Sequence, residues 1–450
     1  MQEVKVIGAG LAGSEAALQL AKRGIKVKLY EMRPNKTTGA HVTQDCAEFV
    51  CSNSLGSSDI TNASGLLKKE MEMLGGELIK IAYENSVPAG NALAIAREDF
   101  SKSVTNKIEE NENIEIIREE VNEIPEGNVI IASGPLTSDN LAKSIQEFTE
   151  IEHLHFFDAI APIVELESIN FDKAFWASRY DKGEASYINC PMNKEEYEKF
   201  YNILINAPRI ELHDVDKNAK FFESCLPVEV LASRGVDTLR FGPMKPVGLV
   251  DKRTGVENHA VVQLRQDNSA KTLFNLVGFQ TNLKWGAQKE LIHSIPGLEE
   301  ANIVRYGVMH RNTFINSPHV LNSTLEAKNR RGLFFAGQIT GTEGYTESIA
   351  TGMFAGINMA RRLEGKDLLT LTRETMLGAL TFYITDKAHL EHISSRDNSL
   401  RYLPLQPTNS NWAIVSPMEM PRNVKRDKKL KTQLLSQRAR EVLEDYVNKL

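Results

Sequence analysis

The chain is short of cysteine: four of its 450 residues are Cys, namely Cys46, Cys51, Cys190 and Cys225. So few cysteines cannot form a disulfide framework in a chain of this length, and none of them belongs to the CxxC pair that is typical of a zinc site. We therefore expect no metal site, and we expect any cysteine that matters to act as a thiol.

The sequence also lacks a long apolar run and a net positive charge. No stretch of about 18 apolar residues is present to cross a bilayer, and the first residues, MQEVKVIGAG, lead directly into a strand without a basic and apolar leader. The formal net charge of −6 excludes a uniformly basic coat for nucleic acid, although it does not exclude a local patch. These features predict a cytoplasmic globular protein of two or three domains that does not enter a membrane.

The first thirty residues follow the order strand, glycine turn, helix and strand. The strands are expected at 3–7 and 27–30 and the helix at 14–23, and Glu31 stands directly after the second strand. The turn between the first strand and the helix consists of Gly8, Ala9, Gly10, Leu11, Ala12 and Gly13. This arrangement is a complete βαβ fingerprint for a dinucleotide.

Each glycine of this turn has its own task in such a site. Gly8 permits the tight turn, Gly10 lets a pyrophosphate approach the backbone, and Gly13 lets the helix pack closely on the strand. The helix N-terminus then faces the phosphates, and Glu31 can accept hydrogen bonds from ribose hydroxyls. The spacing predicts a bound dinucleotide but does not separate FAD from NAD.

A second glycine-rich turn, far along the chain, favours FAD. An apolar strand at 332–336 leads into it, and the helix-like stretch 348–362 follows, whose small residues we expect to pack closely on a flat ligand. The run 129–135 is typical of the connecting strand in flavoproteins of the glutathione-reductase type. The cofactor-binding residues expected in this turn are Gly337, Gln338, Gly341, Gly344 and Tyr345. The predicted fold class is thus α/β, a Rossmann-like FAD-binding domain of the glutathione-reductase type with an inserted α+β domain.

The motifs divide the chain into four parts. Residues 1–95 are expected to form the first part of the FAD-binding domain, 96–329 a mixed region with the inserted domain and returning FAD-domain strands, 330–365 the closing part, and 366–450 a helical, basic C-terminal region. The oligomeric state stays open.

Two cysteines raise a rival function. Four residues separate Cys46 from Cys51, which is the spacing of the redox disulfide in glutathione-reductase-like enzymes. The sequence has no second glycine fingerprint for a stably bound nicotinamide nucleotide and no C-terminal His-Glu pair to serve the thiol, which disfavours an FAD-dependent disulfide oxidoreductase. Cys46 and Cys190 are interpreted as buried apolar residues. Cys51, in a polar segment, and Cys225, two residues before Pro227, are candidate reactive thiols.

Seven segments between residue 3 and about residue 362 carry a resemblance to a known family. They are GAGLAGSEAA, FVCSNSLGSSDITNASGLLKKEM, VPAGNALAIAREDFS, IIASGPLTSDNL, FESCLPVEVLASRGVDTLRFGPMKPVGL, RYGVMHRNTFINSP and GLFFAGQITGTEGYTESIATGMFAGINMA. Together they resemble the folate- and FAD-dependent tRNA (uracil-5-)-methyltransferase family, TrmFO. The related MnmG flavoproteins share the FAD elements but are longer.

The resemblance implies methylation of a uridine at C5 in the TψC loop of tRNA. The carbon would come from 5,10-methylenetetrahydrofolate, which leaves tetrahydrofolate, and the reducing equivalents from NAD(P)H through FAD. Carried over from the family, Cys51 and Cys225 would be the catalytic pair: one thiolate adds to C6 of uracil, and the other group removes the C5 proton. The sequence does not assign the two roles. A ribosomal RNA uridine as the target, or an RNA-folding role with methylation secondary, stay as alternatives.

Several residues are candidates for substrate binding. Arg97 could bind the glutamate of folate or an RNA phosphate, or it could form a surface salt bridge with Glu98 or Asp99. Trp285 could stack on a pterin or on a base.

The segment 422–440 reverses the charge of the chain locally. Its eight cations stand against a single acid, Asp427, and they include Lys428, Lys429 and Lys431. This density suits a tRNA backbone.

Overall fold

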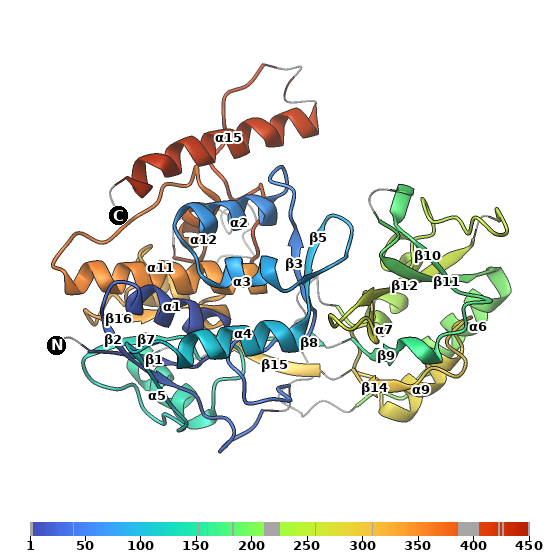
Figure 1. Ribbon diagram of the computed structural model, residues 1–450, viewed down its shortest axis with the longest axis horizontal. Helices are drawn as coiled ribbons and strands as arrows, with labels where there is room; N and C mark the ends of the chain where they lie inside the picture. Colours follow the sequence, from blue (N-terminus) through green and yellow to red (C-terminus); the bar gives the residue numbers. More distant parts are fainter. Residues whose placement is uncertain are drawn as a thin grey trace, which may run out of the picture.

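The computed structural model describes residues 3–38, 40–150, 154–159, 161–181, 184–210, 226–256, 258–307, 309–385, 405–421, 424 and 427–448. These residues form a larger and a smaller lobe, and a long helix, α15, lies across the larger one (Figure 1). Among these residues, no helix combines the length and the apolar character that a membrane span needs.

A parallel five-stranded sheet forms the centre of the larger lobe. Its order is β16 (Leu333–Phe335), β7 (Asn128–Ile131), β1 (Glu3–Ile7), β2 (Lys26–Tyr30) and β6 (Ile114–Ile117). Its strands are apolar runs such as NVII and LFF, because both faces of the sheet are covered. Helices α1 (Leu11–Ala21) and α11 (Tyr345–Leu363) lie on one side of the sheet and α5 (Asp139–Thr149) on the other (Figure 1).

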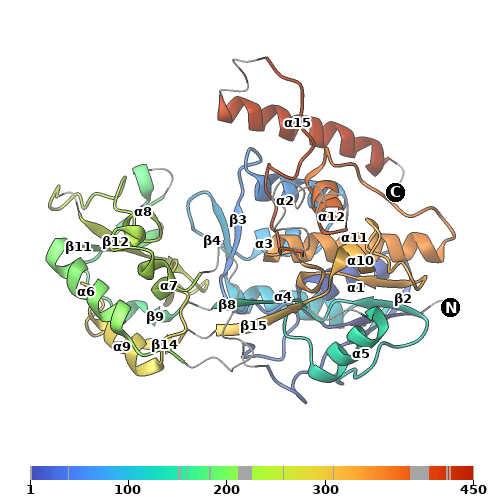
Figure 2. The same cartoon turned by 180° about the vertical axis from the view of Figure 1, so that it is seen from behind.

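Other elements of this lobe pack around the α1–α11 layer. They are β3 (Ser54–Ser57), α2 (Ala63–Met73), α3 (Leu78–Glu84), β4 (Ser86–Val87), β5 (Ala92–Ile95), α4 (Arg97–Glu109), α10 (Ser317–Val320), the 3₁₀ turn Gln338–Thr340, and α12 (Met376–Thr385). Strands β3, β5 and β4 form a small antiparallel sheet. Figure 2 shows α15 (Lys428–Val447) lying over α2, with which it is in contact.

The smaller lobe is built on an antiparallel sheet with its own apolar core. The sheet order is β10 (Phe175–Ala177), β11 (Tyr187–Met192), β12 (Ala260–Gln266), β13 (Leu273–Leu276), β9 (Ile163–Glu165) and β14 (Ile303–Arg305). The helices of this lobe are α6 (Lys194–Asn206), α7 (Val228–Ser233), α8 (Thr238–Phe241) and α9 (Trp285–His293), with 3₁₀ turns at Leu166–Ser168 and Arg179–Asp181.

A two-stranded ribbon joins the lobes. The chain leaves the larger lobe along β8 (Leu154–Ala159) and returns along its antiparallel partner β15 (Met309–Phe314). A parallel sheet with helices on both faces, interrupted by an α+β unit, is the architecture that the glycine motifs predict. The predicted fold class is therefore confirmed.

Candidate functional site

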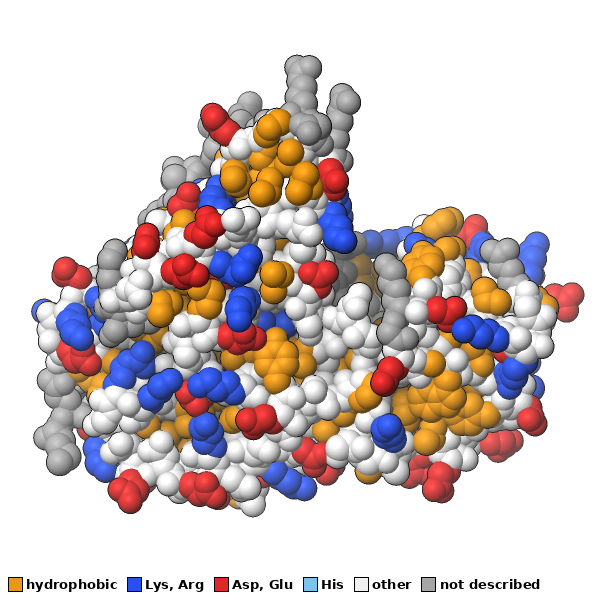
Figure 3. Space-filling model, turned by 45° about the horizontal axis from the view of Figure 1, so that its top comes forward, with side chains coloured by type: hydrophobic (Ala, Val, Ile, Leu, Met, Phe, Trp, Pro, Cys, Tyr) orange, Lys and Arg blue, Asp and Glu red, His pale blue; other side chains and the backbone are white. Residues whose placement is uncertain are grey.

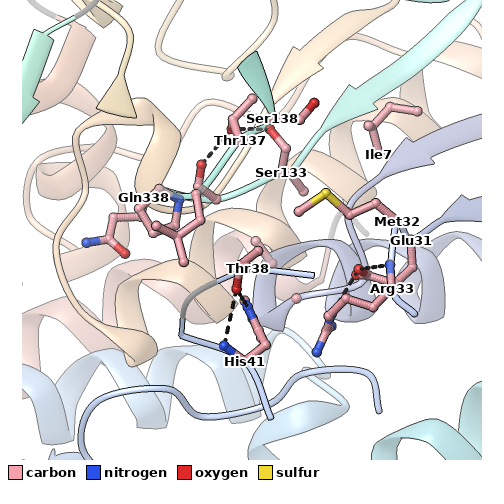
Figure 4. Close-up of a pocket in the computed structure, with 18 of the residues that line it drawn as sticks. Ile7, Glu31, Met32, Arg33, Thr38, His41, Ser133, Thr137, Ser138 and Gln338 are labelled. Atoms are coloured by element: carbon pink, nitrogen blue, oxygen red, sulfur yellow. Dashed lines mark hydrogen bonds and ion pairs between the residues drawn. The ribbon is translucent and has the colours of Figure 1, made fainter. Parts of the chain in front are cut away.

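An open pocket of about 1020 Å³ lies at the carboxyl ends of the parallel strands. This is the place where sheets of this kind bind ligands, beside the strand at which the connections change direction. The lining includes eight of the residues predicted to bind the cofactor, namely Gly8, Gly10, Leu11, Ala12, Glu31, Gln338, Gly337 and Tyr345. Figure 4 shows Glu31 and Arg33 on one side of the pocket, Ser133 and Thr137 on another, and Gln338 opposite Glu31.

The three glycines of the first turn fit a bound pyrophosphate. Gly8 has a φ of +99°, and a Cβ there would lie 2.6 Å from the carbonyl oxygen of Ala132. A Cβ on Gly13 would lie 1.8 Å from the carbonyl oxygen of Gly8, so the helix packs directly on the strand end. A Cβ added to Gly10, the N-cap of α1, would have no other atom within 4 Å, and Gly10 lines the pocket. The space beside Gly10 and the helix N-terminus thus suit the phosphates of FAD.

Glu31 is held as a carboxylate at the end of β2. One of its oxygens accepts a hydrogen bond from the backbone N–H of Ala9 (3.1 Å), and the other accepts from the backbone N–H and the Nε of Arg33 (3.0 and 2.9 Å). Burial raises the pKa of Glu31, but the hydrogen bonds and charge of Arg33 outweigh it, so this pKa stays below its ordinary value. The carboxylate can accept further hydrogen bonds from a ribose. Arg33, which the sequence motifs did not identify, also bonds Glu48 at 3.0 Å.

The second glycine turn shapes the far side of the pocket. Gly337 lies against α1, where an added Cβ would be 2.8 Å from that of Ala12. Gly341 (φ +84°) packs against Leu405, and Gly344 (φ +114°) lies against the Glu347 carboxylate, so these two shape the turn rather than line the pocket. The small residues of α11 correct one expectation. Gly352 and Gly356 would place a Cβ 2.2 Å and 2.9 Å from the carbonyl oxygens of Ala12 and Ala16, and neither lines the pocket, so these two glycines pack on α1.

Tyr345 joins the cofactor pocket to the thiol of Cys51. Its hydroxyl oxygen accepts hydrogen bonds from the backbone N–H groups of Val50 (3.1 Å) and Cys51 (2.7 Å) and lies 2.8 Å from the Cys51 sulfur. Because the two N–H groups occupy both lone pairs of the oxygen, the hydroxyl hydrogen is the one that is directed at the sulfur. Burial, followed by the neighbouring Cys51, raises the pKa of Tyr345 well above its ordinary value, so the phenol remains a donor.

Two buried arginines hold the segment that carries Cys51. Arg97, at the start of α4, bonds the carbonyl oxygens of Phe49 (3.3 Å) and Cys51 (3.0 Å) and pairs with Asp267 (2.9 Å) rather than with Glu98 or Asp99. The side chain is 8% exposed.

The second arginine comes from the smaller lobe. Arg265, on β12, bonds the Oδ1 of Asn53 and the Oγ of Ser52, each at 2.9 Å. The Asn53 amide in turn bonds the carbonyl oxygens of Ile95 (3.0 Å) and Gln266 (2.7 Å). The position of the thiol therefore depends on both lobes.

The other predicted residues lie apart from this thiol or outside the described residues. Cys225 lies outside the described residues. Cys46 is a free, fully buried thiol, and burial raises its pKa to about 11. Trp285, at the start of α9, is 61% exposed and stacks on Tyr306 with ring centroids 5.5 Å apart.

The basic C-terminal segment is only partly engaged with the protein. The guanidinium of Arg438 bonds the carbonyl oxygens of Ser416 and Pro417. Lys428, Lys429 and Lys431 are exposed on the first turn of α15. Acidic and basic side chains are mixed over the face of the larger lobe that Figure 3 shows.

The comparisons with known proteins agree with this geometry. Residues 3–367 match the family named Glucose inhibited division protein A. The protein named methylenetetrahydrofolate–tRNA-(uracil-5-)-methyltransferase TrmFO from Anoxybacillus flavithermus is 54% identical over 448 residues, which cover 100% of both chains. Its namesake from Ligilactobacillus salivarius is 54% identical over 445 residues, or 99% of this chain and 98% of the relative.

A solved structure shares the fold. GidA of Aquifex aeolicus superposes with a TM-score of 0.63 at 19% identity, covering 89% of this chain and 74% of its own. At this identity the likeness concerns the fold alone, whereas the full-length relatives above show the family. The chain belongs to the TrmFO family, within the wider Glucose inhibited division protein A family.

Proposed function

We propose that the protein is a methylenetetrahydrofolate–tRNA-(uracil-5-)-methyltransferase. It transfers the one-carbon unit of 5,10-methylenetetrahydrofolate to C5 of a uridine in the TψC loop of tRNA, and NAD(P)H supplies the reducing equivalents through FAD. The observation that carries the proposal is a cysteine, Cys51, bonded to a tyrosine that lines a pocket built for FAD. The TrmFO name of relatives that match the whole chain supports the same activity.

Methylation at C5 of uracil requires a thiol in a fixed position. C5 of uracil is a weak nucleophile, and a thiolate that forms a bond to C6 moves the ring electrons so that C5 can attack the one-carbon unit. A base then takes the C5 proton, and the S–C6 bond breaks when the product forms. We assign these two roles to the pair Cys51 and Cys225. The Tyr345 hydroxyl, by donating to the Cys51 sulfur, favours its thiolate form, which either role requires.

The pocket residues keep the cofactor in place beside this thiol. Gly10 and the N-terminus of α1 would hold the pyrophosphate, Glu31 the ribose, and the turn at Gly337 and Gln338 the flavin end. When bound, FAD supplies the hydride that completes the methyl group. We place the enzyme in the cytoplasm, where tRNA and reduced nicotinamide nucleotides are available to it.

The disulfide oxidoreductase is the weaker candidate. In that enzyme class, Cys46 and Cys51 would be the redox pair, but the Cys46 thiol is fully buried and its pKa is about 11, so it is poor at thiol exchange. Cysteine variants separate the two functions. In the methyltransferase, Cys51→Ala and Cys225→Ala abolish methylation with FAD retained, while Cys46→Ala has little effect. In a reductase, Cys46 is essential and Cys225 is dispensable.

One experiment tests the proposal directly. The protein is incubated with NADH, labelled methylenetetrahydrofolate and either an unmodified tRNA or a ribosomal RNA transcript, and the label is mapped by nuclease digestion and mass spectrometry. We expect label at C5 of one TψC-loop uridine and none with Cys51→Ala. Label in ribosomal RNA alone would change the target, and no transfer to either RNA would refute the methyltransferase. A 5-fluorouridine tRNA then assigns the two cysteines, because it traps the C6 adduct and only loss of the nucleophile prevents that adduct.

A further inference from the structure

A second pocket lies beside the first turn of α15, and the cofactor chemistry does not use it. We refer to it as the α2–α15 pocket, and its volume, open mouth included, is about 1520 Å³. Its lining comes from the β3–α2 segment, the start of α11, residues 409–412 and the first turn of α15. Tyr345 lines this pocket and the cofactor pocket alike, so the two pockets meet at the residue that bonds Cys51.

The mouth of the pocket is cationic. Lys428 and Lys429 line it, and both residues are exposed. Two carboxylates stand nearby, but both are engaged in local turns: Asp427 caps Leu430 N–H at 3.0 Å, and Asp59 accepts from the backbone and hydroxyl of Thr61 at 2.8 Å. Asp59 keeps its charge and interacts with Lys429, while both lysines stay exposed at the mouth, where a phosphate can reach them.

The interior of the pocket has the opposite character. Glu343 and Glu347 are buried there, and Glu347 already accepts hydrogen bonds from the backbone N–H and the hydroxyl of Ser410. Trp412 contributes an aromatic wall. A simple anion would be repelled by these carboxylates. A ligand with a negative end for the mouth and a flat end with N–H or O–H donors for the interior matches both halves, and a nucleotide has this chemistry.

We propose that the α2–α15 pocket receives one nucleotide of the RNA substrate, a neighbour of the target uridine, with its phosphate at Lys428 and Lys429 and its base inside. This inference rests on the proposed function. The occupant is a neighbour and not the target, because Tyr345 would stand between a base in this pocket and the flavin. A local site of this kind also suits a chain of net charge −6, which cannot rely on a uniformly basic surface.

Three variants of the full-length, FAD-bound protein test the pocket. Lys428→Ala/Lys429→Ala removes the cations, and Asn62→Trp fills the mouth without a change of charge, since the exposed Asn62 lines the pocket and its side chain does not cap α2. Lys143→Ala is the comparison, because Lys143 is exposed on α5 and lies outside the lining. FAD content and thermal unfolding verify the fold of each variant.

The measurement is the Kd for an unmodified tRNA transcript, by fluorescence anisotropy, at several salt concentrations. We expect the double variant Lys428→Ala/Lys429→Ala to raise the Kd for tRNA roughly tenfold. It should lower the slope of log Kd against log salt concentration by about 0.7 to 0.9, as one lost phosphate contact does. Asn62→Trp should raise Kd about fivefold or more with the slope unchanged, and Lys143→Ala should raise it less than about twofold.

Two results would overturn the proposal that the α2–α15 pocket receives a nucleotide. One is an Asn62→Trp protein that binds tRNA as the wild type does, since a filled pocket must then be irrelevant. The other is a Lys143→Ala effect equal to that of Lys428→Ala/Lys429→Ala, which would mean that any lost surface cation weakens RNA binding as much. Methylation by the wild type is scored separately. A protein that binds RNA through the pocket but transfers no label refutes the proposed function alone, and one that methylates tRNA with Asn62→Trp unaffected refutes this inference alone.

Discussion

Removal of one oxygen atom, in Tyr345→Phe, tests whether the tyrosine hydroxyl controls the reactivity of Cys51. The phenyl ring stays in place against Phe49, whose ring centroid lies 4.4 Å from that of Tyr345, so the cofactor pocket keeps its wall. The hydrogen bond to the Cys51 sulfur is lost, as are the bonds that the hydroxyl accepts from Val50 and Cys51 N–H.

The magnitude follows from the kind of hydrogen bond. A hydrogen bond to a charged group contributes about 1.5–3 kcal/mol. The bond to sulfur is of this kind only when Cys51 is a thiolate, so its loss disfavours the reactive form. The thiolate that loses this bond is also intrinsically more nucleophilic, so only about half of this free energy reaches the rate. Because about 1.4 kcal/mol corresponds to a factor of ten in rate, alkylation of Cys51 at neutral pH should slow by about 4- to 20-fold. The two amides left without an acceptor lower the stability of both protonation states and do not add to this factor.

The assay is the rate at which iodoacetamide modifies the Cys51 peptide, followed by mass spectrometry between pH 7 and 9. Tyr383→Phe is the matched control, because its hydroxyl has a carbonyl partner at 3.5 Å in another part of the larger lobe. We expect wild-type rates in the control and recovery of the Tyr345→Phe rate as the pH rises. A Tyr345→Phe protein that is alkylated within twofold of the wild type at neutral pH, with FAD bound normally, would refute the assigned direction of this hydrogen bond.

Three further outcomes follow from the geometry. Gly10→Val should yield a folded protein without flavin absorbance, because its side chain meets open space in the protein but takes the place of the pyrophosphate; a folded variant with full flavin absorbance would contradict this. Arg97→Met should lower the free energy of unfolding, measured in urea, by about 3–5 kcal/mol, because it leaves Asp267 buried without its ion partner. A loss under about 1 kcal/mol would show that the ion pair does not stabilise the fold. Cys46, with a pKa of about 11 and no exposed surface, should resist iodoacetamide at pH 8 in the folded protein; modification at the rate of a free thiol would contradict its burial.

The place of the pocket that the glycine motifs line could be predicted from the sequence because its signals are local. The turn from Gly8 to Gly13 and the acid at Glu31 lie within one βαβ unit, and each residue has a steric or hydrogen-bonding task that its neighbours reveal. Arg33 was missed although it stands two residues after Glu31, because no motif distinguishes an arginine that orients a carboxylate from an exposed one.

The surroundings of Cys51 could not be predicted in the same way. The acids nearest to Arg97 in sequence are Glu98 and Asp99, but consecutive residues on a helix point about 100° apart, so Arg97 turns into the protein while the Glu98 side chain is 70% exposed. Its actual partner, Asp267, lies 170 residues away. Small residues on α11 were equally ambiguous, since a helix that approaches another helix and one that approaches a flat ligand both require them.

The way in which Cys51 is held explains why its loop sequence alone says so little about its chemistry. Arg97 fixes the loop from the larger lobe through the carbonyl oxygen of Cys51, while Arg265 fixes it from the smaller lobe through Asn53 and Ser52. Both guanidinium groups are buried, so neither anchor is lost without leaving polar groups unsatisfied. We expect the 2.8 Å contact between the sulfur and the Tyr345 hydroxyl to depend on both anchors, because the two backbone N–H groups that bind the same oxygen belong to that loop. A substitution at Arg265, in the smaller lobe, should therefore slow Cys51 alkylation as Tyr345→Phe does, while it leaves Gly8, Gly10 and Gly13 in place to bind FAD.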